Sequence, residues 1–278
     1  MGPFARVLWS ALAYRYHLRL FAGYIELCHW ARDLDIDFLK AADFFASLAS
    51  DERVYLLVRH GERRHITPQD PDFGAHVGLT DKGREQALNL GKCIPPEGDI
   101  CFYSSPVGRC VETAQFIGKG RASVQGILQA GDAAQVSSAP HVEPLTCLAE
   151  YFVQNYDEYM KVLRAGFYEG ICAWLFAEEA RISSGTGTYS GNEPFAPLAK
   201  RSEEMLAMML EKGSCRFNIF ATHDAWVVPC LVYFCKLHFT PQRWMNYLTG
   251  MAVVTGPDGK TPRRIAPVTG LETGWLEF

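Results

Sequence analysis

The chain has 278 residues, of which 48% are hydrophobic, 13% aromatic and 21% charged, a composition typical of a globular protein with a sizeable core. The formal net charge is −4, and no basic stretch is long enough to follow a nucleic-acid backbone. We therefore expect no nucleic-acid partner. At this length we expect one large domain, or one domain with a sizeable insertion.

The N-terminal 30 residues are apolar enough to raise the question of membrane targeting. Their longest uncharged stretch after Arg6 is Val7–Tyr14, which is too short to span a bilayer. No small-residue cleavage site follows, and Arg6 stands where myristoylation requires serine or threonine. We expect residues 5–30 to form an amphipathic helix packed on the domain, with no integral membrane segment. A role at a membrane surface or in binding a partner is the alternative.

The cysteines give little support for a metal site or a disulfide framework. There are nine of them, an odd number, scattered along the chain and never spaced as CxxC. We expect most to be small buried residues in a reducing compartment, which predicts a cytoplasmic protein.

The hydrophobic pattern predicts helices first and then an alternation of strands and helices. The expected elements are a helix over 35–48, strands at 53–59, 99–104 and 215–222, helices at 80–91, 105–117 and 225–235, and a late hairpin turning at 257–260. Such alternation implies a mostly parallel sheet with helices on both faces, that is, a three-layer α/β sandwich.

The pattern loosens between Lys119 and Pro197. We expect a single domain over 1–278 with a helical N-terminal extension at 1–50 and a cap-like insertion at about 121–196. The insertion holds a strand candidate at 141–145 and a helix near 156–180. An insertion over the active edge is a natural place for substrate selection. The alternative is a packed helical excursion with no role in substrate choice.

Three expected strands end in unusual polar residues, and parallel strands bring such ends to one edge of the sheet. The first strand leads into Arg59 and His60, the second into 104–109, and the third into His223 and Asp224. This edge is therefore the predicted binding site.

The residue types at this edge suit a phosphate ester. Guanidinium groups bind phosphate oxygens with paired hydrogen bonds, and Arg59, Arg63 and Arg109 tolerate one another best around an anion. A histidine among positive charges stays neutral, and neutral imidazole is a nucleophile, which makes His60 the candidate nucleophile. Gly61 would let the phosphate approach the backbone.

Four motifs together resemble the histidine phosphatase superfamily: VRHGE at 58–62, LTDKGREQA at 79–87, YSSPVGRCVETA at 103–114 and ATHDA at 221–225. The resemblance runs from about 53 to 235 and omits the first 50 residues and most of 121–195. It implies that His60 is transiently phosphorylated, that Arg59, Arg109 and His223 hold the phosphoryl group, and that neither a metal nor another cofactor is needed.

The motifs mix the two branches of that superfamily, which leaves the general acid open. RHGER resembles the acid-phosphatase branch, which implies a phosphate contact for Arg63 and the acid role for Asp224. LAEYF at 148–152 resembles the mutase-like branch and offers Glu150. The sequence argument favours Asp224, which adjoins His223. As alternatives, Asp224 is a helix N-terminal aspartate, and Glu150 is a solvated loop carboxylate.

The predicted activity is metal-independent hydrolysis of a small phosphorylated substrate through a phosphohistidine. Two alternatives stay open. One is a phosphoglycerate mutase-like transferase, although the Gly- and Ser-rich stretch at 183–192 gives no sign of the closed site that a mutase needs. The other is a non-catalytic phosphate-binding regulatory protein. The sequence does not determine the substrate or the oligomeric state.

Overall fold

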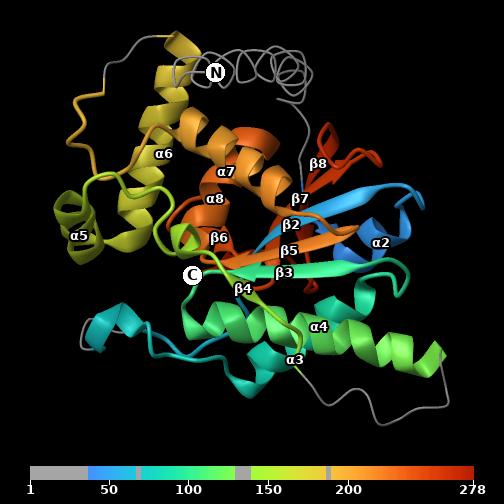
Figure 1. Cartoon of the computed structure of the whole chain (residues 1–278). Helices are drawn as coiled ribbons and strands as arrows, with labels where there is room; N and C mark the ends of the chain where they lie inside the picture. The colour runs from blue at the N-terminus through green and yellow to red at the C-terminus, as the bar shows by residue number, and fades with distance from the viewer. Residues whose placement is uncertain (1–36, 67–69, 129–138, 186–188) are drawn as a thin grey trace, which may run out of the picture.

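The computed structural model describes residues 37–66, 70–128, 139–185 and 189–278 (Figure 1). The helix expected over 5–30 lies outside these residues. A central sheet has the strand order β1-β8-β7-β2-β5-β3-β4. Its strands are Leu39–Lys40 (β1), Arg53–Arg59 (β2), Ile100–Ser104 (β3), Glu143–Pro144 (β4), Phe217–Thr222 (β5), Thr249–Thr255 (β7) and Pro262–Thr269 (β8).

All strand pairs in this sheet are parallel except the two that involve β7. Strands β2 and β5 are the near-continuous apolar runs RVYLLVR and FNIFAT, and they are buried on both faces, as the inner strands of a parallel sheet must be. The predicted α/β sandwich with a mostly parallel sheet is confirmed.

Helices cover both faces of the sheet (Figure 1). One layer contains α2 (Ala41–Ala46), α3 (Asp81–Cys93) and α4 (Gly108–Leu128), and the other contains α6 (Phe167–Ser184), α7 (Leu198–Lys212) and α8 (Asp224–Cys235). Alternate residues of β2 face the two layers: Leu56 and Val58 pack with the first layer, Tyr55 and Leu57 with the second. This alternation is the two-residue period of a strand buried on both sides.

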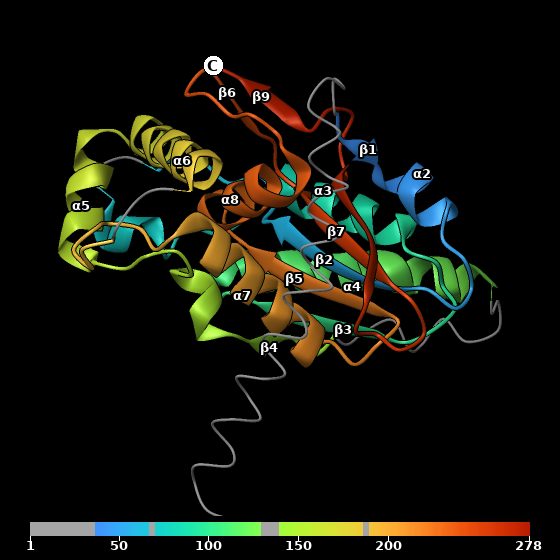
Figure 2. The same cartoon turned by 90° about the horizontal axis from the view of Figure 1, so that it is seen from above.

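Several predicted boundaries are wrong. Instead of one helix over 35–48, a short strand, β1, pairs with β8 and leads directly into α2. The helix after β3 begins at Gly108 and continues to Leu128. The helix expected near 156–180 is two helices, α5 (Tyr156–Ala165) and α6, because Gly166 has a φ of 151°, which no helix accommodates. Figure 2 shows α5 and α6 beyond the carboxyl ends of the parallel strands.

The sheet contains the predicted C-terminal hairpin and a disulfide that was not expected. The expected C-terminal hairpin forms between β7 and β8. The structure joins Cys101 to Cys215, a disulfide that the sequence did not predict. The two cysteines are 114 residues apart and meet only because β3 and β5 are neighbours.

Of the helices within the described ranges, none has the length and apolarity to cross a membrane.

Candidate active site

The register of the central strands brings the predicted residues together. Arg59 at the end of β2 pairs with Thr222 at the end of β5. The backbone N–H of His60 continues this ladder by donating to the Thr222 carbonyl at 2.9 Å, and Ser105 after β3 donates to Ala221 at 2.9 Å. All three strands therefore end at one level, as the sequence predicted.

His60 is buried with its Nδ1 atom 2.8 Å from the carbonyl oxygen of Gly61. Because a carbonyl oxygen can only accept, Nδ1 carries the proton, and Nε2 keeps its lone pair. Burial, then the charges of His223, Arg109 and Arg59, lower the pKa of His60 well below 6.5. The imidazole is thus neutral with a free nucleophilic nitrogen.

Gly61 lies against helix α3, a close contact that the sequence did not predict. A Cβ atom at this position would lie 2.6 Å from the backbone oxygen of Gly83 in α3. The Gly61 N–H donates to the Thr113 hydroxyl at 3.0 Å. The glycine is required because helix α3 approaches the backbone closely at Gly83, and this contact fixes the chain beside His60.

Arg59 is held on three sides. Its Nη1 atom donates to the Met245 carbonyl, and its Nη2 atom lies 3.1 Å from Asp224 Oδ2. The guanidinium carbon lies 4.3 Å from the centre of the Tyr247 ring. Among the described residues the buried Nε atom has no hydrogen-bond partner. Arg59 is thus rigidly placed, and within the described structure its Nε–H remains available to a ligand.

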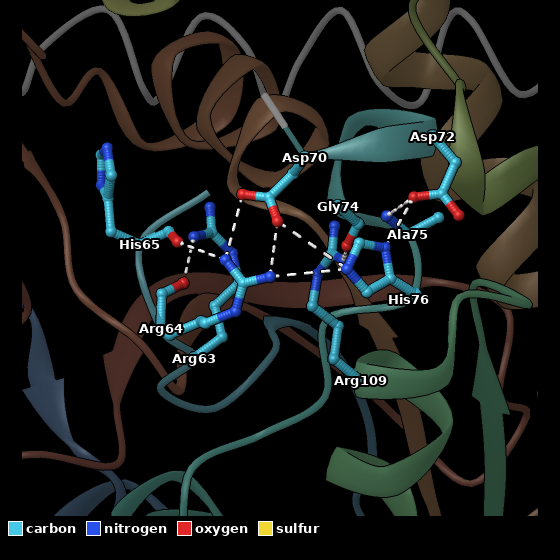
Figure 3. Close-up of polar contacts among 9 residues, drawn as sticks. All are labelled: Arg63, Arg64, His65, Asp70, Asp72, Gly74, Ala75, His76 and Arg109. Atoms are coloured by element: carbon cyan, nitrogen blue, oxygen red, sulfur yellow. Dashed lines mark hydrogen bonds and ion pairs between the residues drawn. The ribbon is translucent and has the colours of Figure 1, made fainter. Parts of the chain in front are cut away.

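Arg109, in the first turn of α4, contacts a carbonyl and a neutral imidazole, and no carboxylate of the described residues forms an ion pair with it. Its Nη1 atom donates to the Gly74 carbonyl at 2.8 Å, and its Nη2 atom lies 3.3 Å from His223 Nδ1. Figure 3 shows Arg109 reaching Gly74 in the 63–76 loop. In the described structure its buried Nε atom also lacks a partner. Burial lowers the pKa of Arg109, although a guanidinium remains charged.

The 63–76 loop brings a third arginine to the site. Arg63 donates through Nη1 to the Arg64 carbonyl at 2.9 Å, and its buried Nε atom is the third without a partner in the described ranges. Arg63 contributes to lowering the pKa of both His223 and Asp224, so it lies near them. The neighbouring Arg64 turns away and pairs with Asp70 at 2.5 Å (Figure 3).

His223 orients Arg109. Because Arg109 can only donate, His223 Nδ1 is the acceptor of that contact, and Nε2 carries the proton toward the Ser105 hydroxyl at 3.1 Å. Burial, followed by the charge of Arg109, lowers the pKa of His223 to about 3. Both histidines of the site are therefore neutral near pH 7.

The two candidate acids have opposite environments. Asp224 is buried; its Oδ1 atom accepts from the Ala225 N–H at 3.0 Å, and its Oδ2 atom from Trp244 Nε1 at 3.0 Å. Burial raises the pKa of Asp224, but the Arg59 charge and the Trp244 hydrogen bond outweigh it, so the pKa is lowered overall. Glu150 is exposed and ends the 3₁₀ turn Thr146–Ala149.

Glu150 nevertheless lies at the same edge of the sheet. The carbonyl of Leu148 accepts from the Thr222 hydroxyl at 2.7 Å, and the carbonyl of Ala149 accepts from Trp226 Nε1 at 2.7 Å. These bonds tie the residues just before Glu150 to the end of β5 and the start of α8. All seven predicted site residues thus lie around the strand ends.

The charges at this edge are strongly unbalanced. Three guanidinium groups face one buried carboxylate, and the described residues offer no partner to any of the three Nε atoms. Buried donors without acceptors are rare and costly unless a ligand completes them. An oxyanion with several oxygens would satisfy them, so the geometry is that of an anion site beside a neutral nucleophile.

The two neutral histidines make stability depend on pH. Unfolded histidine titrates near 6.5, so below this pH the unfolded chain binds more protons than the folded chain, and stability falls as pH falls toward 3. We expect His223 to cost about 2 kcal/mol of unfolding free energy between pH 7 and pH 5, and the buried, neutral His60 to lower stability in the same direction. Urea unfolding should show His223→Gln losing the His223 part of this pH dependence. A wild type equally stable at pH 7 and pH 5 would contradict the expected loss of stability.

Sequence reasoning missed four contributors to the site: Ser105, Thr113, Trp244 and Tyr247. Ser105 and Thr113 lie inside a quoted motif, so their position was available although their partners were not. Trp244 and Tyr247 carry no sequence signal, since they reach Arg59 and Asp224 only through folding of the chain after α8. Within the described ranges, no three His, Cys, Asp or Glu side chains form a group that could hold a metal ion.

Comparison with known proteins agrees with the motifs. Residues 55–130 match the model of the histidine phosphatase superfamily (branch 1). No curated protein matches the chain. Similar solved structures include a putative alpha-ribazole-5'-P phosphatase from Escherichia coli, with 16% identity, a TM-score of 0.41 and coverage of 79% of this chain and 99% of that chain.

Two other similar structures are a mutase and a second phosphatase. A phosphoglycerate mutase from Bacillus anthracis has 17% identity, a TM-score of 0.41 and coverage of 79% of this chain and 93% of that one. A mycobacterial glucosyl-3-phosphoglycerate phosphatase has 14% identity, a TM-score of 0.43 and coverage of 80% and 100%. The resemblance predicted from the motifs is confirmed: over residues 55–130 this chain matches the histidine phosphatase superfamily.

Proposed function

We propose that this chain is a phosphatase that hydrolyses small phosphomonoesters through a phosphohistidine on His60, without a metal ion. The observation that carries the proposal is a set of three arginine Nε atoms that have no partner among the described residues, at the same edge as a neutral histidine whose Nδ1 atom is bound and whose Nε2 atom keeps its lone pair. Arg59, Arg63 and Arg109 would bind the phosphoryl oxygens. His223 would turn its Nε2–H from Ser105 to the same group.

In the first step, His60 Nε2 attacks phosphorus in line with the ester oxygen. The P–N bond forms, the P–O bond to the alcohol breaks, and a carboxylic acid gives its proton to the leaving oxygen. In the second step, a water molecule attacks phosphorus, its proton passes to the carboxylate, and the P–N bond breaks. Inorganic phosphate and His60 are regenerated, and the carboxyl group regains its proton.

Electrostatic stabilisation should be the largest contribution to catalysis. Charge builds up on the phosphoryl oxygens in both steps, and guanidinium groups fixed in a buried site need no reorganisation to meet it. The carbonyls of Met245 and Gly74 hold Arg59 and Arg109 in place before substrate arrives. The proposal therefore gives these two backbone oxygens a supporting role.

We propose Glu150 as the general acid, although the sequence argument favoured Asp224. A general acid must be protonated when it acts, and Asp224 is held ionised by Arg59 and Trp244. Glu150 is exposed at the same edge, and the bonds from Thr222 and Trp226 to the carbonyls just before it hold it beside the strand ends, where the phosphate would bind. Its exposure also gives water access for the second step, which favours hydrolysis over phosphoryl transfer in a closed site.

Leaving-group dependence should separate the two carboxyl groups. We expect Glu150→Gln to lower kcat/KM for an alkyl phosphate by about 10²- to 10³-fold but to affect p-nitrophenyl phosphate far less, since nitrophenolate leaves without a proton. Asp224→Asn should slow both substrates by similar factors, because it disturbs Arg59. The reverse pattern would make Asp224 the acid.

Hydrolysis of p-nitrophenyl phosphate from pH 4 to 8, with excess chelator, tests the proposed activity as a whole. Chelator-insensitive release of inorganic phosphate is the expected result. Activity on 3-phosphoglycerate that requires a bisphosphoglycerate would instead indicate a mutase. Phosphate binding without turnover of a panel of natural phosphate esters would indicate a binding protein.

A further inference from the structure

The C-terminal end of the chain forms a small ribbon separate from the central sheet. Strand β6 (Arg243–Met245) pairs antiparallel with β9 (Trp275–Glu277), and the Phe278 N–H donates to the Gln242 carbonyl at 2.9 Å. Figure 2 shows this ribbon beside α8, with the C-terminus at its tip. The ribbon lies outside the motifs of the family, yet it contacts the site twice.

Both contacts fall on the Arg59–Asp224 pair. Trp244 Nε1 donates to Asp224 Oδ2 at 3.0 Å, and the adjacent Met245 carbonyl accepts from Arg59 Nη1. Asp224 Oδ2 is also the atom that meets Arg59 Nη2 at 3.1 Å. The ribbon therefore contacts each member of the ion pair, and Trp244 and Arg59 share one carboxylate oxygen.

Trp244 itself is rigidly packed. Its side chain is fully buried, and the rings of Tyr168 and Phe239 lie 5.0 and 5.7 Å from it. An indole held on several sides provides a fixed donor, and a fixed donor fixes the carboxylate that accepts from it. Because a guanidinium is planar, fixing its two Nη atoms also fixes the direction of its Nε–H.

We propose that Trp244 is a positioning residue that holds the Asp224 carboxylate against Arg59 and thereby aims the free donor of Arg59 at bound phosphate. The inference rests on the phosphate site proposed above but does not depend on turnover. Trp244 touches no substrate; it acts through Asp224, and the β6–β9 ribbon carries it into the site.

The test is calorimetric titration of inorganic phosphate at pH 7 into the full-length chain. Trp244→Phe keeps the aromatic bulk and removes the donor, and we expect about tenfold weaker binding, the effect of losing one hydrogen bond to a charged group. The matched control is Trp275→Phe in strand β9 of the same ribbon. It removes an indole N–H that donates to Asp37 at 2.9 Å, away from the site. It should bind phosphate as the wild type does.

A double-mutant cycle distinguishes positioning from packing. In Asp224→Asn the charge that orients Arg59 is gone, so adding Trp244→Phe should change phosphate affinity by less than about twofold. An equal loss in both backgrounds would mean that Trp244 acts by packing and would overturn the inference. The inference would also be overturned if Trp244→Phe bound phosphate as tightly as the wild type, or if the wild type bound no phosphate.

The outcome for the inference is distinct from that for the proposed function. A wild type that binds phosphate but hydrolyses no ester would disprove the phosphatase, while the expected cycle in the same protein would still support the role of Trp244. A wild type that hydrolyses esters, together with a Trp244→Phe variant of unchanged phosphate affinity, would uphold the phosphatase and reject the positioning role.

Discussion

Replacing His60 with alanine should reduce turnover of p-nitrophenyl phosphate by about four orders of magnitude or more, the scale of losing a covalent nucleophile. The reason is geometric as well as chemical. His60 Nδ1 is bound to the Gly61 carbonyl, which leaves Nε2 as the nitrogen that can attack. Steady-state kinetics with inorganic phosphate release as the readout would measure the loss.

Acid quenching during turnover provides a second measurement of the same step. The wild type should carry acid-labile phosphate on histidine, and His60→Ala should carry none. His76→Ala is the matched control, since His76 is an exposed histidine of the neighbouring loop that contacts Asp72 at 2.9 Å. A His60→Ala variant with near-normal activity would rule out the phosphohistidine mechanism.

Arg109→Met should make the protein less active and more stable at the same time. Arg109 is a buried cation whose partners are the Gly74 carbonyl and a neutral histidine, so its burial is poorly compensated. We expect kcat/KM to fall by about 10²- to 10³-fold. The unfolding free energy should rise by about 1 kcal/mol or more, which corresponds to a Tm higher by about 2–4 °C per kcal/mol.

Arg121 offers a matched comparison on the same helix. It is also buried, but its guanidinium donates to the carbonyls of Pro95 at 2.8 Å and Gly98 at 2.6 Å. Arg121→Met should therefore lower Tm and leave the affinity for inorganic phosphate unchanged, the opposite pattern. A lower Tm for Arg109→Met would mean that its carbonyl and imidazole contacts do compensate its burial without an anion.

The elements that the sequence predicted well are those specified by local pattern. The runs at 53–59 and 215–222 are long enough and apolar enough to be inner strands, and Thr80 does cap helix α3 by accepting from the Gly83 N–H at 3.0 Å. Local pattern failed at 35–48 and at 156–180. There the helical period continues through residues that tertiary structure assigns to β1 and to the break at Gly166.

The candidate site was also predicted only in part. The sequence by itself determined that Arg59, His60 and the other strand-end residues share one edge, because parallel strands with apolar runs must align their carboxyl ends. The sequence could not determine which of these side chains form hydrogen bonds or ion pairs with one another. The sequence favoured Asp224 as the acid, and only the fold shows that Arg59 and Trp244 both contact its carboxylate.

Only the tertiary structure decided which side chains and backbone groups bind one another at the site. The Gly74 carbonyl on Arg109, the Trp244 indole on Asp224 and the Cys101–Cys215 disulfide all join segments whose contact depends on loop path and packing. Residue type and periodicity are local quantities, whereas burial and ion pairing depend on every element packed around a group. The sequence therefore specified which groups meet at this edge, and the fold decided which of them are charged, held or free.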